Sequence, residues 1–191
     1  MVEYKILIQN LDSYTKSHSE RVSDYAVLLG KKVGLSDEDL EKLKIGALCH
    51  DLGKSKIPNY ILEKETKLTD SEFIEIKKHP YFGVTLLEEN SNFKDIVPII
   101  KYHHEKYDGT GYPNNLVGEN IPYLARITAI ADCFDAMISK RTYKDSMSVE
   151  NIIEEFNNCK GTQFDPTLTD AFLDILKNNF DSIKKIQENF K

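Results

Sequence analysis

Residues 123–139 read YLARITAIADCFDAMIS, the most apolar stretch of the chain. If this segment is helical, apolar side chains lie on nearly every face of it, a pattern typical of a helix buried at the centre of a domain. Asp132 stands within this apolar segment. A carboxylate in such surroundings is costly unless it is paired or binds a metal. The segment therefore predicts a central helix that carries a paired or metal-bound aspartate.

Helical periodicity extends over most of the chain on both sides of this segment. Ser36 and Thr69 each begin a sequence typical of a helix N-terminus. No stretch of strand length shows a clear alternation of apolar and polar residues. We predict an all-α fold of about eight to ten helices that forms a single domain over residues 1–191. Apolar residues recur at helical spacing within 22–33, 40–48, 84–87, 96–102, 152–156, 171–180 and 183–190.

The composition of the chain narrows the classes of partner. Its 191 residues fit one domain of roughly 100–200 residues. The formal charge of -6 argues against a nucleic-acid polymer, which usually binds a basic face, but a small anionic ligand fits. No apolar run approaches the ~20 residues of a membrane span, so we expect no membrane partner. Three cysteines without CxxC spacing indicate a reducing compartment, and we expect a cytoplasmic protein.

The histidines form the second notable pattern. His18 lies in YTKSHSERV, His50 directly precedes Asp51, His79 precedes a proline, and His103 and His104 open the segment HHEKYDGTGYP at 103–113. One histidine on a helix is usually a surface or core side chain. Five of them, together with two aspartates in this setting, favour a metal site instead. Imidazole and carboxylate are ligands for Fe, Mn or Zn rather than for Ca.

These histidine-containing segments, in this order along the chain, resemble the HD-GYP family, a branch of the HD metal-dependent phosphohydrolases. HDLGK at 50–54 supplies the HD doublet, and Gly111, Tyr112 and Pro113 supply the GYP. The segments YTKSHSERV, KKHP, ARITAIADCFDAM, RTY and GTQFDP resemble the remaining blocks. The resemblance runs from about residue 12 to residue 172. It implies an HD-type helical bundle with a metal site in its core.

The resemblance also implies a ligand set for two divalent metal ions, most often iron or manganese. Asp51 is then the expected bridging carboxylate. Some family members hold a third metal through a glutamate four residues before the first histidine, but Tyr14 stands there, so we predict two metals. The implied metal ligands are His18, His50, Asp51, His79, His103, His104 and Asp132. A bundle commonly builds such a centre from facing helices.

Adjacent residues on a helix diverge by about 100°. His103 and His104 therefore cannot easily chelate one ion from within one helix. If the two histidines lie at a helix end instead, we expect their imidazoles to approach the metals in different ways.

Other residues are expected to act on the substrate. Lys54 lies three residues beyond Asp51, so a continuing helix would point it at the same site, where it could stabilise transition-state charge. Asp135 is expected to orient a ligand histidine. The resemblance implies that the GYP loop, through Gly111, Tyr112 and Pro113, and the cations Arg141 and Lys144 bind the nucleotide. Cys49 and Cys133, which flank the ligands, are expected to be core residues.

The predicted function is a phosphodiesterase that opens cyclic di-GMP to linear pGpG, and further to GMP, by metal-activated water. Two alternatives stay open: a non-catalytic cyclic dinucleotide receptor or interaction module, and a phosphodiesterase for another cyclic dinucleotide such as cyclic GMP-AMP. Family members often carry a sensor or receiver domain upstream, and none is visible in this sequence. We expect the chain either to act alone or to be a cut domain, and we keep a homodimer as an expectation.

Overall fold

The computed structural model describes residues 8–88, 91–139 and 146–190. Within these ranges the fold is all-α, as predicted, and residues 160 and 164 form an isolated β-bridge. The described α-helices are α2 (Ser13–Lys32), α3 (Asp37–Cys49), α4 (Asn59–Leu62), α5 (Asp70–Ile76), α6 (His79–Leu87), α7 (Val97–Tyr102), α8 (Tyr123–Ile138), α9 (Val149–Cys159), α10 (Pro166–Asn178) and α11 (Phe180–Glu188). Four short 3-10 helices join them: η1 (Ile8–Asn10), η2 (Leu52–Lys56), η3 (Ser91–Phe93) and η4 (Gly118–Asn120).

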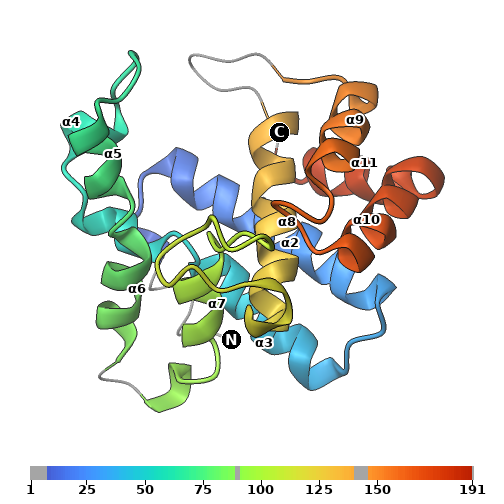
Figure 1. Ribbon diagram of the computed structural model, residues 1–191, viewed down its shortest axis with the longest axis horizontal. Coiled ribbons are helices and arrows are strands. Elements are labelled where there is room, and N and C mark those ends of the chain that lie inside the picture. The colour runs from blue at the N-terminus through green and yellow to red at the C-terminus, as the bar shows by residue number, and fades with distance from the viewer. Residues whose placement is uncertain (1–7, 89–90, 140–145, 191) are drawn as a thin grey trace.

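Helix α8 lies at the middle of the bundle (Figure 1). It corresponds to the apolar segment at 123–139, and Ile127, Ile130 and Phe134 on it are fully buried. The Phe134 ring packs edge-to-face against Tyr25 of α2 and Phe172 of α10, with centroids 4.9 Å and 5.1 Å away. These are favourable geometries for aromatic pairs. The predicted central helix is thus confirmed.

Two hydrophobic cores flank the middle of the molecule. The large core joins α2, α3, α8, α9, α10 and α11, and the small core joins η1, α3, η2, α6 and α7. Helix α3 serves both, because Leu43 and Ala47 pack into the large core while Ile45 and Cys49 pack into the small one. In Figure 1, α6 and α7 lie on one side of α8, and α9, α10 and α11 lie on the other.

Glycine brings the two sides of the small core into close contact. A Cβ on Gly53 of η2 would lie 1.9 Å from the carbonyl oxygen of His79 and 2.5 Å from the backbone nitrogen of Gly83. Only a residue without a side chain permits this approach between η2 and α6. The contact places the turn after α3 beside the first residue of α6.

Helix ends agree with the predicted signals. The Ser36 side chain accepts a hydrogen bond from the backbone N–H of Asp39 at the start of α3. Thr69 and Glu72 form a complete capping box at the start of α5. The described part of the chain contains no helix that combines the length and the apolar character needed to cross a bilayer.

Candidate metal centre

The seven residues predicted as metal ligands come from five places in the fold and meet near the middle of the bundle. His18 lies in α2 and Asp132 in α8. His50 and Asp51 occupy the turn between α3 and η2, and His79 is the first residue of α6. His103 and His104 follow directly after α7. The structure therefore brings all seven side chains together.

Asp51 is the residue that these side chains share. It is almost fully buried, and its two carboxylate oxygens face different histidines. Oδ2 lies 3.3 Å from His50 Nε2 and 3.7 Å from His18 Nε2, whereas Oδ1 lies 3.4 Å from His79 Nε2. One carboxylate thus borders two groups of imidazoles, which is the arrangement a bridging ligand requires.

The first group, which we call the His18 half, consists of His18, His50, Asp132 and Asp51 Oδ2. Asp132 Oδ1 lies 3.1 Å from His18 Nε2 and 3.9 Å from His50 Nε2. This half therefore holds two imidazoles and two carboxylates. Its helices α2 and α8 belong to the large core, and His50 follows α3, which packs into both cores.

The second group, which we call the His79 half, consists of His79, His103, His104 and Asp51 Oδ1. One candidate ligand atom from each of these four residues lies within 4.8 Å of all the others. His103 and His104 both follow α7, which ends at Tyr102, and their ring centroids lie 4.1 Å apart. The prediction placed them at a helix end, and the structure puts both in one cluster.

Backbone carbonyls orient three of the histidines. The Nδ1–H groups of His50, His79 and His103 donate to the carbonyl oxygens three residues earlier, those of Ala47, Ile76 and Ile100, at 2.7–2.8 Å. These carbonyls belong to the last turns of α3, α5 and α7, where helix carbonyls lack helical partners. With Nδ1 bonded to a carbonyl, each imidazole directs its Nε2 toward the cluster.

The geometry of the cluster fits divalent cations. His79 Nε2 and His103 Nε2 lie only 3.3 Å apart, yet both Nδ1 atoms donate elsewhere, so neither Nε2 has a proton to share. Two lone pairs therefore face each other. His50 Nε2 and Asp51 Oδ1 are also buried without a hydrogen-bond partner. Such atoms are costly in a protein interior, and a bound cation would satisfy them.

The electrostatics of the cluster favour the same ligand forms. Burial lowers the pKa of His79 to about 3 and that of His104 to about 4, because it disfavours the charged imidazolium. Burial would raise the pKa of Asp51, but the Lys54 charge and the neighbouring histidines hold it well below its usual value. His79 and His104 are therefore neutral and Asp51 is ionised, the forms in which these groups bind a metal.

His18 behaves differently from the other histidines. Burial alone would lower its pKa, but hydrogen bonds to Asp132 and Asp135 raise that pKa to about 9. Its Nδ1 lies 2.7 Å from Asp135 Oδ2. Asp135, fully buried on α8, thus orients His18 as predicted for an aspartate behind a ligand histidine.

Arg21 completes this arrangement, and the sequence analysis did not identify it. Its Nε and Nη2 donate to the two oxygens of Asp135 at 2.7 Å and 2.9 Å, a bidentate ion pair. Arg21 lies three residues after His18 and therefore on the same face of α2. That spacing was the available signal. The ion pair fixes the carboxylate that in turn fixes His18.

A sequence profile of the family described as "HD domain" matches residues 2–168. The chain belongs to the HD domain family. This confirms the relationship inferred from the HD and GYP blocks. The matched range contains all seven side chains of the cluster.

Relatives of this HD domain include named phosphodiesterases. It is 41% identical over 168 residues to the cyclic di-GMP phosphodiesterase response regulator RpfG of Xanthomonas campestris pv. campestris, covering 87% of this chain and 44% of that protein. It is also 41% identical over 164 residues to 3′3′-cGAMP-specific phosphodiesterase 2 of Vibrio cholerae, covering 84% of this chain and 31% of that protein. The HD domain chain therefore spans less than half the length of these relatives.

A solved structure shares the fold. The structure of Bd1817, described as an HDG"Y"P protein from Bdellovibrio bacteriovorus, superposes with a TM-score of 0.70 at 25% identity. The match covers 86% of this chain and 53% of that one. The all-α architecture of this HD domain is thus that of its structural relatives.

Lys54 reaches the cluster, although not from the predicted continuing helix. Helix α3 ends at Cys49, and Lys54 lies in the 3-10 helix η2. Residues three apart share a face in a 3-10 helix, so Lys54 still projects beside Asp51. Its Nζ lies 2.6 Å from Asp51 Oδ2. The local helix type in the prediction was wrong, whereas the expected position of the ammonium group agrees with the structure.

The GYP loop of the HD domain forms one wall of the His79 half. The Tyr112 ring stacks on the His104 imidazole with centroids 4.8 Å apart. A Cβ on Gly111 would lie 2.2 Å from the backbone nitrogen of Lys106, so only glycine fits there. Pro113 follows Tyr112 through a cis peptide bond and is exposed. Of the three predicted loop residues, Tyr112 is the one that contacts the cluster.

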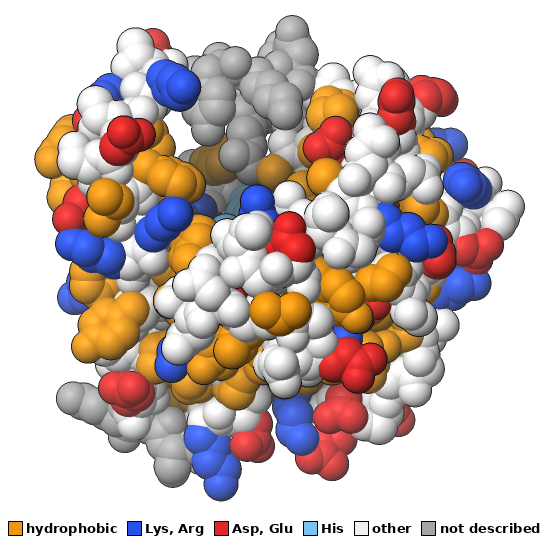
Figure 2. All heavy atoms as spheres, in the orientation of Figure 1, with side chains coloured by type: hydrophobic (Ala, Val, Ile, Leu, Met, Phe, Trp, Pro, Cys, Tyr) orange, Lys and Arg blue, Asp and Glu red, His pale blue; other side chains and the backbone are white. Residues whose placement is uncertain are grey.

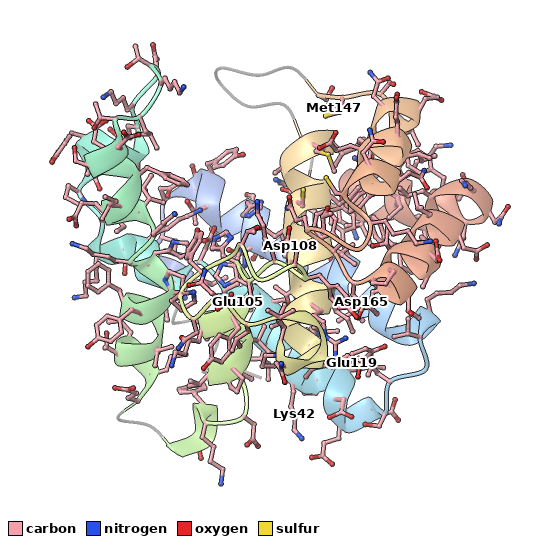
Figure 3. The ribbon with its side chains drawn as sticks, viewed as in Figure 1. Lys42, Glu105, Asp108, Glu119, Met147 and Asp165 are labelled. Carbon is pink, nitrogen blue, oxygen red and sulfur yellow. The ribbon has the colours of Figure 1, made fainter. Side chains whose placement is uncertain are left out.

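Glu105 anchors this loop, and the sequence analysis did not identify it. Its carboxylate is buried and accepts backbone N–H groups from Asn114 at 2.7 Å and Leu116 at 3.0 Å. Figure 3 labels Glu105 within the chain between α7 and α8. An acid directly after a ligand pair, at the start of a loop rich in glycine, was the available signal. Glu105 thus ties the loop to the end of α7.

The remaining predicted residues have varied positions. Arg141 and Lys144 lie outside the described residues. Tyr14, at the position of the third-metal glutamate, lies parallel to the His18 ring with centroids 6.5 Å apart.

Cys49 is buried in the small core, where burial raises its pKa to about 12, and Cys133 packs partly buried against the large core. Both cysteines therefore have the core surroundings that were predicted.

Proposed function

We propose that this HD domain is a metal-dependent phosphodiesterase that opens cyclic di-GMP to linear pGpG and further to GMP. The observation that carries the proposal is the position of Asp51, whose two oxygens face two separate sets of imidazoles. Relatives from Xanthomonas and from Thermotoga maritima are named cyclic di-GMP phosphodiesterases, the latter 33% identical over 187 residues.

In this proposal each half of the cluster would hold one divalent ion, iron or manganese, and Asp51 would be a ligand shared by both halves. His18, His50 and Asp132 would hold one ion, and His79, His103 and His104 would hold the other. Two such ions supply Lewis-acid stabilisation of the phosphoryl oxygens and a lowered pKa for the attacking water. The presence of Tyr14 rather than a carboxylate beside His18 supports two ions rather than three.

Residues of the chain would position the substrate and its charge. The Lys54 ammonium, held at Asp51, would contact a phosphoryl oxygen and stabilise the charge that develops there. Tyr112 would contact the nucleotide from the wall beside His104. Gly111 and Pro113 shape that wall, and Arg141 and Lys144 are proposed to bind phosphate. The protein would act in the cytoplasm.

A second substrate has its own support. Identity to the 3′3′-cGAMP-specific phosphodiesterase 2 of Vibrio cholerae equals that to RpfG, at 41%. A phosphodiesterase for cyclic GMP-AMP is therefore the alternative enzyme. An upstream sensor or receiver domain and a homodimer are kept as proposals for the whole protein. A non-catalytic receptor agrees less well with seven converging candidate ligands.

Product analysis tests the proposal. The purified chain, loaded anaerobically with Fe(II) or Mn(II), is incubated with cyclic di-GMP or cyclic GMP-AMP, and products are separated by chromatography. We expect pGpG from cyclic di-GMP, and no product from Asp51→Asn protein of unchanged helix content. Faster consumption of cyclic GMP-AMP than of cyclic di-GMP would identify cyclic GMP-AMP as the preferred substrate. A folded protein with verified metal that consumes neither nucleotide would defeat the proposal, and binding without turnover would identify a receptor.

A further inference from the structure

Two adjacent lysines between α5 and α6 have different surroundings. Lys78 Nζ pairs with Glu75 Oε1 at 2.5 Å on the outside of the helix. Lys77 Nζ instead lies 4.8 Å from the centre of the Phe73 ring and 5.2 Å from the centre of the Tyr112 ring. Within the described ranges, no carboxylate forms an ion pair with Lys77. The Lys77 side chain is exposed, and its ammonium contacts two aromatic rings.

The Tyr112 ring links Lys77 to the metal centre. Tyr112 contacts the His104 imidazole in a stack and Lys77 in a cation–π contact. Lys77 therefore lies at the rim of the His79 half, one aromatic ring away from His104.

An exposed cation at this rim would strengthen the binding of an anionic substrate. The chain has a net charge of -6. Lys54 is already engaged by Asp51. Figure 2 shows a hollow with a histidine on its floor and basic side chains at its border. An exposed cation–π contact is weak, so Lys77 can leave the rings for a phosphate at little cost.

A cyclic dinucleotide carries two phosphodiester groups, and only one can lie at the metals at a time. We propose that Lys77 binds the phosphodiester that is not being cleaved, while that part of the nucleotide lies against Tyr112. This inference rests on the proposed function and identifies a residue that recognises the second phosphodiester of the cyclic dinucleotide. Lys77 is accordingly a substrate-binding residue, and Phe73 holds it in place when the site is empty.

Two substrates and two lysine variants test this assignment. Cyclic di-GMP has a second phosphodiester, whereas bis(p-nitrophenyl) phosphate has none. In manganese-loaded protein, Lys77→Ala should raise KM for cyclic di-GMP roughly tenfold or more, the usual effect of a lost charged hydrogen bond, with kcat within about twofold. Its kcat/KM for bis(p-nitrophenyl) phosphate should not change. Lys77→Arg should restore most of the KM.

Lys78→Ala is the matched control, because it removes the same charge one residue away. Lys78→Ala protein should keep the wild-type kinetic constants for both substrates. An unchanged KM for cyclic di-GMP in Lys77→Ala protein would overturn the assignment. Equal losses on both substrates would also overturn it, since Lys77 would then act through the metal centre. Metal content measured on each variant separates these cases from simple loss of metal.

Failure of the proposed function gives a different result. Wild-type protein would then cleave bis(p-nitrophenyl) phosphate but leave the cyclic dinucleotide intact. Equilibrium binding of cyclic di-GMP decides the role of Lys77 in that case. The assignment holds if Lys77→Ala binds at least about tenfold more weakly than wild type and Lys78→Ala binds equally well. Equal binding by Lys77→Ala, or no binding by wild type, overturns it.

Discussion

The two halves of the metal centre belong to different hydrophobic cores and are held by different forces. The His18 half rests on the large core, and the ionic chain Arg21–Asp135–His18 orients its first histidine. The His79 half rests on the small core, and backbone carbonyls orient His79 and His103, as one also orients His50 of the His18 half. In the His18 half, positive and negative side chains of the protein pair with one another. In the second, converging nitrogen lone pairs have no protein proton between them.

This difference indicates how a helical bundle can build one site from two cores. Asp51 lies where they meet, because α3 contributes to both cores and ends just before it. The contact of Gly53 with α6 then sets the separation of the two halves. Both halves therefore depend on Asp51.

Removal of Asp51 should have the largest effect. Asp51→Asn leaves one amide in place of the shared carboxylate, and we expect phosphodiesterase activity to fall by at least about 10³-fold, since loss of a single transition-state donor already costs about 10²–10³-fold. Steady-state product formation measures this. A loss of less than tenfold would show that the halves work without their shared ligand.

Single-histidine variants should separate the halves. We expect both His18→Ala and His79→Ala to lose one of two metal sites and to retain the other, because each variant leaves Asp51 and the opposite half intact. Isothermal titration of metal-free protein with Mn(II) counts the sites. If either variant bound no metal, the halves would be a single cooperative unit rather than two.

Asp135 should affect only the His18 half. Asp135→Asn weakens the partner of His18 Nδ1 and leaves Arg21 without its bidentate carboxylate. We expect a 10–100-fold loss of metal affinity in that half, the usual effect of changing a residue behind a ligand. Competition with a metal-binding dye measures it. The affinity of the His79 half should stay within about threefold, and an equal loss in both would contradict the separation.

The halves should also differ in their response to pH in chelator-treated protein. The pKa of His18 is raised to about 9 from an ordinary 6.5, so its stabilising contribution is complete below pH 6.5 and is lost as pH rises to about 9. The pKa of His79 is lowered to about 3, so stability is lost as pH falls below 6.5.

Urea unfolding across pH 5–10 tests these opposite trends. The difference in unfolding free energy between wild type and His18→Gln should shrink from pH 6.5 to pH 9. A difference that stayed constant or grew over this range would contradict the ion-paired state of His18.

The sequence predicted the helices and the candidate ligands better than it predicted their supports. The apolar segment at 123–139, the caps at Ser36 and Thr69 and the histidine blocks are local signals, and the structure places them as expected. Arg21 and Glu105 were missed because their roles depend on partners distant in the chain or on loop backbone. Lys54 was placed on the wrong helix type because the end of α3 has no strong local signal. The division into two cores depends on long-range packing, which a single sequence does not reveal.

Counting the metal in wild-type protein tests the central claim most directly. Protein purified anaerobically without chelator, supplied with Fe(II) or Mn(II) and freed of excess ion, is analysed by inductively coupled plasma mass spectrometry. We predict two ions per chain in wild type. One ion or three ions per chain, in protein that is folded and fully loaded, would contradict a centre of two halves joined by Asp51.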